Sequence, residues 1–163
     1  MKNSAERLEW ALKRCERSHV RMTSVRAAIL GFLSQQRKPV NLDAISQAAG
    51  VRGQYDATTV YRTLMVFKDA GLVRCVGMLR KTSHFVLSVP GDVGHFLVCE
   101  RCGAVAELEL SPAVLAGLER LALEHGFAAS GQCMDLHGVC RACEDAARRT
   151  VPASKVMARH CFV

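Results

Sequence analysis

Four of the eight cysteines form two matched pairs, and thiolates at this spacing bind metal ions. The pairs are Cys99-Glu-Arg-Cys102 and Cys140-Arg-Ala-Cys143. A two-residue spacer lets both sulfurs of a pair reach one ion, and two such pairs complete a tetrahedral zinc shell. Because four thiolates leave no coordination position open, the predicted ion is structural and not catalytic. We expect it to stabilise the part of the chain between residues 95 and 145.

Paired cysteines have two other common roles, a thioredoxin-like redox motif and packing in a core. The redox motif needs one CxxC at the start of a helix that follows a strand, whereas this chain has two matched pairs. The charged amino-terminal stretch lacks the apolar core of an export signal, so we expect a cytoplasmic protein without a disulfide framework. The remaining cysteines are scattered: Cys15, Cys75, Cys133 and Cys161.

A second chemical feature is the polar face of the helix expected after Asp56, which caps it. The apolar positions Val60, Leu64 and Phe67 share one face by helical spacing. Recognition helices place the remaining, outward or amino-terminal residues against base edges and phosphates. We predict DNA contacts from this helix and from one upstream arginine: Arg26, Thr58, Thr59, Tyr61 and Arg62. The competing interpretation is an ordinary amphipathic helix with a solvated outer face.

The distribution of charge favours a polyanionic partner for the first half of the chain. Residues 1–82 carry 15 Lys and Arg against 6 Asp and Glu, whereas residues 83–163 carry 7 against 9. A basic amino-terminal half and a mildly acidic remainder are typical of a DNA-binding domain joined to a second domain. No apolar run is long enough for a membrane span, so we expect no membrane partner.

The elements that must position these residues predict an α+β fold with a winged helix-turn-helix in front of a second domain. Helices are expected over 5–15, 24–34, 42–50, 57–70 and 112–125, and strands over 72–76, 84–89, 95–99, 104–110 and 133–137. The run Val89-Pro-Gly-Asp-Val-Gly94 predicts a hinge. The expected division is 1–88 winged helix, 89–94 hinge, 95–145 dimerisation and metal-binding domain with the Cys₄ zinc site, and 146–163 a weakly patterned tail.

Taken together, these stretches resemble the ferric uptake regulator family. The matching segments, in the family's order, are Thr23-Ser-Val-Arg-Ala-Ala-Ile-Leu30, Ala57-Thr-Thr-Val-Tyr-Arg-Thr-Leu64, His95-Phe-Leu-Val-Cys-Glu-Arg-Cys-Gly-Ala-Val-Ala-Glu107 and Leu136-His-Gly-Val-Cys-Arg-Ala-Cys143. The two cysteine segments are most similar to the family's zinc-sensing branch. The resemblance implies a homodimer that represses metal-uptake genes at a palindromic operator, with structural zinc on the four paired cysteines and a second, sensory metal near the hinge.

The sensory site is where this chain departs from the family pattern. The His-rich run that iron and peroxide sensors carry before the first CxxC is reduced to His95, and Val86 and Ser88 stand where the family often has ligands. The donors left near the hinge are Cys75, His84, His95 and Glu107. One thiolate, two imidazoles and a carboxylate suit tetrahedral zinc better than octahedral iron or manganese, so about two zinc ions per chain are expected. Each of the four also has an ordinary structural role available to it.

Three other functions are weighed against a zinc-dependent repressor. A sensor of iron, manganese, haem or peroxide would share the fold and differ in the ion that activates DNA binding. A redox or zinc-dependent enzyme is disfavoured because the chain has no Ser/His/Asp grouping, no HExxH and no phosphate-binding glycine loop. A zinc-ribbon module that binds protein is disfavoured by the basic first half and the Thr-Thr-Val-Tyr-Arg helix. We therefore expect no catalytic residues.

Overall fold

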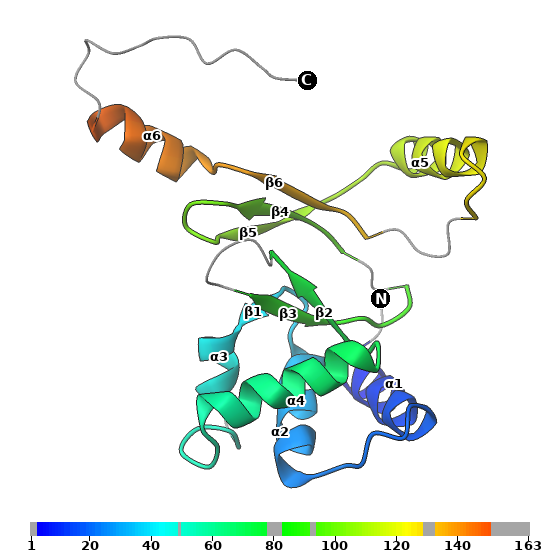
Figure 1. Ribbon diagram of the computed structural model, residues 1–163, viewed down its shortest axis with the longest axis vertical. Coiled ribbons are helices and arrows are strands. Elements are labelled where there is room, and N and C mark those ends of the chain that lie inside the picture. Colours follow the sequence, from blue (N-terminus) through cyan, green and yellow to red (C-terminus); the bar gives the residue numbers. More distant parts are fainter. Residues whose placement is uncertain (1–2, 49, 78–82, 92–93, 129–132, 151–163) are drawn as a thin grey trace.

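The computed structural model describes residues 3–48, 50–77, 83–91, 94–128 and 133–150. Four helices and a small sheet form the amino-terminal part, and a second sheet with two helices forms the carboxy-terminal part (Figure 1). In this view the second sheet lies directly above the first, and helices α5 and α6 extend outward on opposite sides. No helix in the described ranges has the length and apolar character needed to cross a membrane.

Four helices build the amino-terminal part, and three of them begin at a side chain that caps free backbone N–H groups. Their bounds are α1 Ser4–Arg17, α2 Ser24–Gln35, α3 Leu42–Ser46 and α4 Ala57–Asp69. Asn3, Asn41 and Asp56 accept the capping hydrogen bonds of α1, α3 and α4. At the other end of α4, Gly71 has a φ of +69°, which explains why glycine follows this helix. The predicted cap and stop of α4 are therefore confirmed.

A three-stranded antiparallel sheet closes the winged helix, in the order β1-β3-β2. Its strands are β1 Val40–Asn41, β2 Val73–Val76 and β3 His84–Leu87. The helices and one face of this sheet enclose a core in which Ile29, Leu33, Leu64, Phe67 and Phe85 are fully buried. The apolar face predicted for α4 thus packs inward and leaves its polar face outside.

The second sheet combines antiparallel and parallel pairing, in the order β5-β4-β6. Its strands are β4 His95–Cys99, β5 Val105–Leu108 and β6 Asp135–Gly138. Strand β4 pairs antiparallel with β5 and parallel with β6. Helix α5, Pro112–Glu124, connects β5 to β6, and α6, Arg141–Thr150, follows β6. Ser111 caps α5 and Pro112 occupies its first turn, as predicted.

The two sheets meet along a small apolar seam, which we define as Val76, Val86, Phe96, Val98 and the flanking Val105. Val76 and Phe96 are almost entirely buried there. A Cβ atom on Gly77 would lie 2.8 Å from Cγ1 of Val98, so the backbone at the end of β2 approaches β4 more closely than any other residue type allows. The winged helix and the second sheet are therefore in direct contact.

Two expectations about the elements were wrong. The tail was expected to be weakly patterned from residue 146 onward, but α6 continues to Thr150. This helix carries an i,i+4 ion pair between Glu144 and Arg148 at 3.0 Å. The helix predicted to end at Gly50 ends at Ser46 and continues as turns. Part of the predicted hinge, residues 92–93, and the tail beyond 150 lie outside the described residues.

Candidate zinc centre and DNA-facing helix

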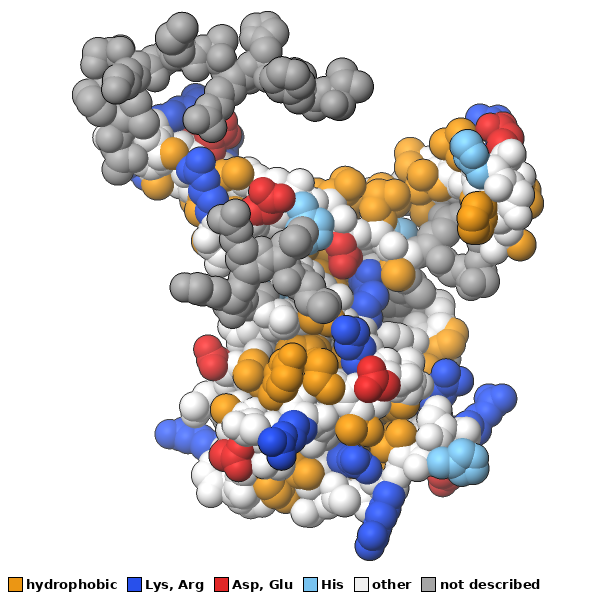
Figure 2. All heavy atoms as spheres, in the orientation of Figure 1, with side chains coloured by type: hydrophobic (Ala, Val, Ile, Leu, Met, Phe, Trp, Pro, Cys, Tyr) orange, Lys and Arg blue, Asp and Glu red, His pale blue; other side chains and the backbone are white. Residues whose placement is uncertain are grey.

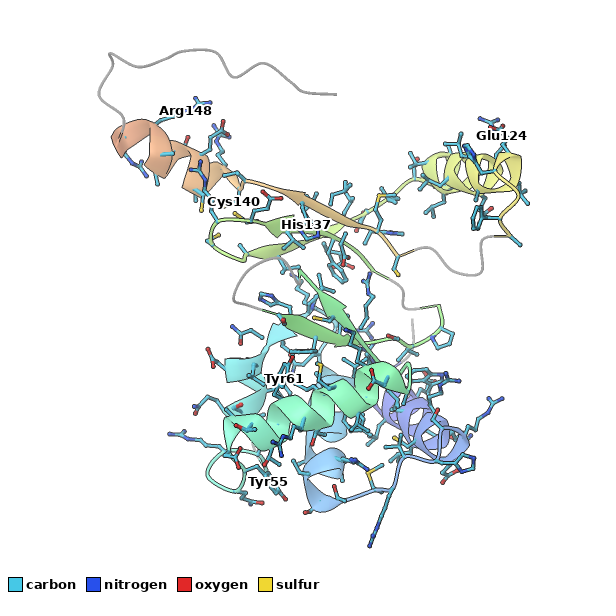
Figure 3. All side chains as sticks on the ribbon, viewed as in Figure 1. Tyr55, Tyr61, Glu124, His137, Cys140 and Arg148 are labelled. Atoms are coloured by element: carbon cyan, nitrogen blue, oxygen red, sulfur yellow. The ribbon has the colours of Figure 1, made fainter. Side chains whose placement is uncertain are left out.

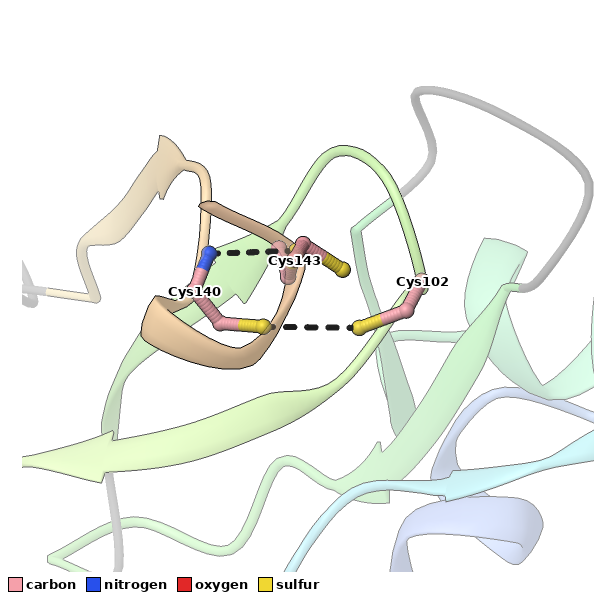
Figure 4. A group of neighbouring side chains, drawn as sticks. Cys102, Cys140 and Cys143 are labelled. Atoms are coloured by element: carbon pink, nitrogen blue, oxygen red, sulfur yellow. Dashed lines mark hydrogen bonds between the residues drawn. The ribbon is translucent and has the colours of Figure 1, made fainter. Parts of the chain in front are cut away.

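The four paired cysteines converge at one end of the second sheet. Cys99 is the last residue of β4, Cys102 lies in the turn toward β5, Cys140 precedes α6, and Cys143 is in its first turn. Their Sγ atoms all lie within 4.8 Å of one another. Figure 4 shows the thiols of Cys102 and Cys140 pointing toward each other, with Sγ atoms 3.7 Å apart. The parallel pairing of β4 and β6 brings both cysteine pairs to the same edge.

The spacing of the sulfurs fits zinc. With Zn–S bonds of about 2.3 Å, two sulfurs at the corners of a tetrahedron are about 3.8 Å apart. The observed 3.7 Å matches that edge and is far longer than the roughly 2.05 Å of a disulfide bond. All four cysteines are free thiols in this arrangement. The residues present therefore fit a closed tetrahedral zinc site.

Backbone N–H groups prepare the quartet to carry negative charge. Hydrogen bonds from the backbone N–H groups of Cys102 and Cys140 lower the pKa of the Cys99 thiol to about 6. Cys140 N donates to Cys99 Sγ at 3.3 Å. Hydrogen bonds with the neighbouring Cys102 and Cys140 side chains raise the pKa of Cys143 to about 12. Four thiolates this close repel one another, and a divalent cation between them removes that repulsion.

Two local features hold the loops of the cysteine pairs in place. Gly103 has a φ of +73° and its N–H donates to the carbonyl of Cys99 at 2.9 Å, which closes the first loop. Arg101 lies inside that loop and donates from Nη1 to the carbonyl of Cys143 at 3.1 Å, which ties the first pair to the second. The two loops are thus joined by a direct hydrogen bond, in addition to the convergence of their four sulfur atoms on one site.

Helix α4 presents most of its predicted DNA-contacting residues to solvent. Thr58, Tyr61 and Arg62 are exposed, and Figure 3 shows Tyr61 on α4 above the turn that carries Tyr55. Thr59 is half-buried, and its N–H and hydroxyl both donate to the Asp56 carboxylate, at 2.8 and 3.0 Å. Thr59 therefore helps to cap the helix, and its hydroxyl is engaged within the protein.

The structure adds one residue to this surface and modifies the role of another. The Tyr55 hydroxyl donates to Ser24 Oγ at 2.8 Å, which joins the starts of α2 and α4. The position of Tyr55 directly before the helix cap was the signal in the sequence that could have pointed to it. The guanidinium of Arg26, predicted to contact phosphate, is half-buried and donates to the carbonyl of Arg21. Arg26 itself lies in the first turn of α2.

The residues predicted for the sensory site are not gathered in one place. Cys75 pairs across the sheet with Phe85, and both pack toward the helical core. His84 pairs with Val76, whose side chain belongs to the seam on the other face. Cys75 and His84 therefore extend from opposite faces of the β2–β3 hairpin.

The two predicted ligands from the second sheet also diverge. His95 is buried, and its Nδ1 atom has no hydrogen-bond partner among the described residues. Glu107 is exposed and lies opposite Phe96, one position along from His95, so the two side chains leave different faces of the sheet. Within the described ranges, the cysteine quartet is the grouping of potential ligands close enough to share an ion.

Comparison with known proteins identifies the class to which this fold and site belong. The family model described as "Ferric uptake regulator family" matches residues 17–137. A peroxide-responsive repressor from Staphylococcus aureus (strain NCTC 8325) is 30% identical over 141 residues, covering 85% of this chain and 92% of the relative. The chain belongs to the ferric uptake regulator family.

Solved structures agree on the fold and differ in the metal after which each regulator is named. The ferric uptake regulator of Vibrio cholerae superimposes with a TM-score of 0.64 at 24% identity, covering 78% of this chain and 98% of that one. A zinc uptake regulator bound to zinc and DNA is 29% identical, with a TM-score of 0.50 and coverage of 91% and 99%. A zinc-bound manganese uptake regulator is 27% identical, with a TM-score of 0.56 and coverage of 80% and 98%.

Family membership establishes the class of activity. The chain is a metal-responsive transcription regulator and not an enzyme, and one solved relative of this family is complexed with DNA. The expected α+β fold with a winged helix is confirmed. The relatives are divided among peroxide, zinc, manganese and iron regulators, so membership alone does not identify the activating metal.

Proposed function

We propose that this protein is a zinc-responsive repressor that binds a palindromic operator as a homodimer in the cytoplasm and controls metal-uptake genes. The cysteine quartet carries the structural-zinc part of this proposal, because its 3.7 Å sulfur separation fits tetrahedral zinc at the junction of β4, β6 and α6. Bound there, zinc would supply a structural cross-link and no reactive position. A zinc-loaded, DNA-bound relative at 29% identity supports the choice of metal.

The proposed homodimer is supported by an apolar surface on the carboxy-terminal part. Figure 2 shows hydrophobic side chains exposed between α5 and the second sheet. Among the described residues, the sheet and the α5 region leave seven large apolar side chains more than 40% exposed: Leu97, Val114, Leu121, Leu123, Phe127, Leu136 and Val139. Exposed apolar groups of this extent on the carboxy-terminal part mark a protein interface, and a second copy of the chain would cover them.

We propose that a regulatory zinc takes its ligands from Cys75, His84, His95 and Glu107, with DNA contacts from Arg26, Thr58, Thr59, Tyr61 and Arg62. Because Cys75 and His84 lie on opposite faces of the β2–β3 hairpin, binding to both requires a change in that hairpin. The start of β2 is joined to the end of α4, since Leu72 N donates to Phe67 O at 2.8 Å. A change in the hairpin would therefore reach the DNA-facing helix.

A peroxide, iron or manganese sensor is the second candidate. It is favoured by the 30% identity to a peroxide-responsive repressor over most of the chain. The two candidates differ in the ion that restores operator binding, because the structural site is common to both.

The test is a metal titration of protein stripped with a mild chelator, read by metal content per chain and by operator binding. The proposal expects about one zinc to survive stripping, and added zinc to strengthen operator binding roughly 10- to 100-fold. Cys75→Ser should remove most of that response and leave the retained zinc unchanged. Cys133→Ser is the matched control, since Cys133 is exposed and outside the quartet.

Three results would change the proposal. Restoration by iron(II) or manganese in place of zinc would select the second candidate and leave the structural site intact. An unchanged zinc response in Cys75→Ser would remove Cys75 from the sensory set. Loss of all zinc during stripping, with the fold preserved, would contradict the structural site.

A further inference from the structure

The Arg74 side chain crosses the seam between the winged helix and the second sheet. Arg74 is on β2, in the amino-terminal sheet. Its Nη1 donates to Oδ1 of Asp135 on β6 at 3.1 Å, and its Nη2 donates to the carbonyl of Gly94 at 2.7 Å. The guanidinium carbon also lies 5.1 Å from the centre of the Phe96 ring. One side chain of the winged helix thus contacts two residues of the second domain, Asp135 and Phe96, and the last residue of the expected hinge, Gly94.

These contacts are sheltered from solvent, unlike the helical ion pairs on the surface. The side chains of Arg74 and Asp135 are 20% and 21% exposed, whereas those of the Lys13–Glu9 pair are 68% and 63% exposed. Shielding from water strengthens an ion pair and raises the cost of removing one partner. The planar guanidinium also holds two acceptors at fixed directions, which an ammonium group does not do.

The receiving side is shaped for this contact. A Cβ atom on residue 94 would lie 2.7 Å from Cζ of Phe96, so glycine leaves room for the ring on which Arg74 rests. Asp135 pairs with Phe96 in the parallel register of β4 and β6, which puts the carboxylate next to the ring. The apolar seam continues from Phe96 to Val76 and Val86, so polar and apolar contacts act across the same boundary.

We propose that Arg74 is an interdomain latch, built from protein atoms alone, that sets the orientation of the winged helix relative to the second sheet. Only three residues separate Arg74 from Ala70, the carboxy-terminal cap of α4, and the Leu72–Phe67 hydrogen bond ties that connection. The latch therefore controls the orientation of α4 relative to the carboxy-terminal domain. Its geometry involves none of the residues proposed for the regulatory zinc.

The experiment compares zinc-loaded full-length protein with variants on both sides of the latch, first by small-angle X-ray scattering. Arg74→Met removes the charge and keeps a long apolar side chain, and Asp135→Asn removes the partner's charge with little change in shape. Arg14→Met is the matched control, because Arg14 Nε also donates to a carbonyl, that of Ala70 at 3.1 Å, but within one domain. We expect both latch variants, and not the control, to have a larger radius of gyration and a broader distance distribution.

Operator binding provides the second readout, which rests on the proposed DNA-binding role of α4. Each latch variant should bind roughly tenfold more weakly, and the double variant no more weakly than either single one, because both substitutions break one contact. Arg74→Lys should fall between wild type and Arg74→Met. Circular dichroism and retained zinc should match wild type.

Scattering curves of both latch variants identical to wild type would overturn the proposal, as would fully additive effects of the two substitutions on operator binding. Failure of the zinc-responsive function is a separate result. A wild-type protein that binds its operator equally with and without added zinc would contradict that function and leave the scattering comparison unaffected.

Discussion

At the scale of single residues, the sequence was enough to predict the cysteine quartet. It was not enough to predict how the four proposed sensory ligands are arranged in space. A CxxC pair is a local signal, because two residues of spacing suffice to aim both sulfurs at one ion. The parallel β4–β6 register then brings Cys99 and Cys140 together, as the matching of the pairs implied. Cys75 and His84 were grouped by their nearness to the hinge, but the face on which each side chain lies depends on strand register, which spacing alone does not reveal.

Replacing one cysteine of the quartet should release the structural metal. In Cys102→Ser, the hydroxyl is a poor zinc ligand, so we expect about one zinc per chain to be lost and the carboxy-terminal domain to melt at lower temperature. Metal analysis and thermal unfolding measure both effects. Cys133→Ser should retain the zinc and the melting temperature. Retention of the zinc in Cys102→Ser would show that three thiolates suffice.

The outward residues of α4 should account for operator affinity. Arg62→Ala removes an exposed charge without touching the core, and we expect about 1–3 kcal/mol weaker operator binding with unchanged thermal stability. Arg120→Ala on α5 is the control, because Arg120 is also exposed but belongs to the other domain. Electrophoretic or anisotropy titrations compare the two. Equal losses in both variants would point to general electrostatics and away from α4.

At the scale of elements, helices with a cap and a steady apolar period were predicted closely, and short or weakly apolar elements were not. Helix α4 begins at Ala57 as expected, because Asp56 caps it and Gly71 follows it. Strand β1 has two residues and is held by pairing with β3, a long-range contact that leaves no periodic signal. Helix α6 carries many charged residues and few apolar ones, so its sequence looked like a tail.

The cap of α4 should make the winged helix sensitive to acid. Hydrogen bonds from Thr59, its backbone N–H first, lower the pKa of Asp56 below 3.8, so the carboxylate stabilises the folded state above that value. This contribution is lost as the pH falls through the lowered pKa. We expect the stability difference between wild type and Asp56→Ala to be constant near neutral pH and to shrink in acid. Thermal unfolding followed across the acid range measures it, and a difference that grows in acid would contradict the assignment.

A buried position on the same helix tests the packing behind it. Leu64 is fully buried in the helical core, so Leu64→Ala should cost about 2–5 kcal/mol in the free energy of unfolding. Chemical denaturation measures this cost, and Met65→Ala, at a half-buried neighbouring position, should cost less. A Leu64→Ala variant as stable as wild type would mean that this face of α4 does not pack in the core.

At the scale of the whole molecule, the asymmetry of charge was visible in the sequence, but the contact between the sheets was not. Arg74 counted toward the positive charge of the first half of the chain. In the structure it is directed to Asp135, which is 61 residues away in the chain. Such a pairing emerges only when both domains have folded and met, so composition could not foretell it.

Operator binding should weaken steeply with salt, because the winged helix carries the positive charge. Each phosphate contact releases counterions, so a plot of log affinity against log salt should be linear, with a slope of about −0.9 for each phosphate contacted. Figure 2 shows Lys and Arg side chains spread over the helical part that would meet the phosphates. Titrations at several salt concentrations give the slope. An affinity independent of salt would exclude a phosphate-dominated interface.

The parallel pairing of β4 with β6 has a consequence for the order in which the chain matures. The residues of the winged-helix core lie between Leu8 and Val89, so this domain can fold once residue 89 has been synthesised. The zinc ligands become adjacent only after β6 and the start of α6 have been made, because β4 waits for a strand that follows α5. Bringing β4 and β6 together across the intervening segment is slow without the cross-link that zinc provides. Metal binding should therefore be a late step of folding. A cell short of zinc would accumulate chains in which the winged helix is folded and the carboxy-terminal domain is not.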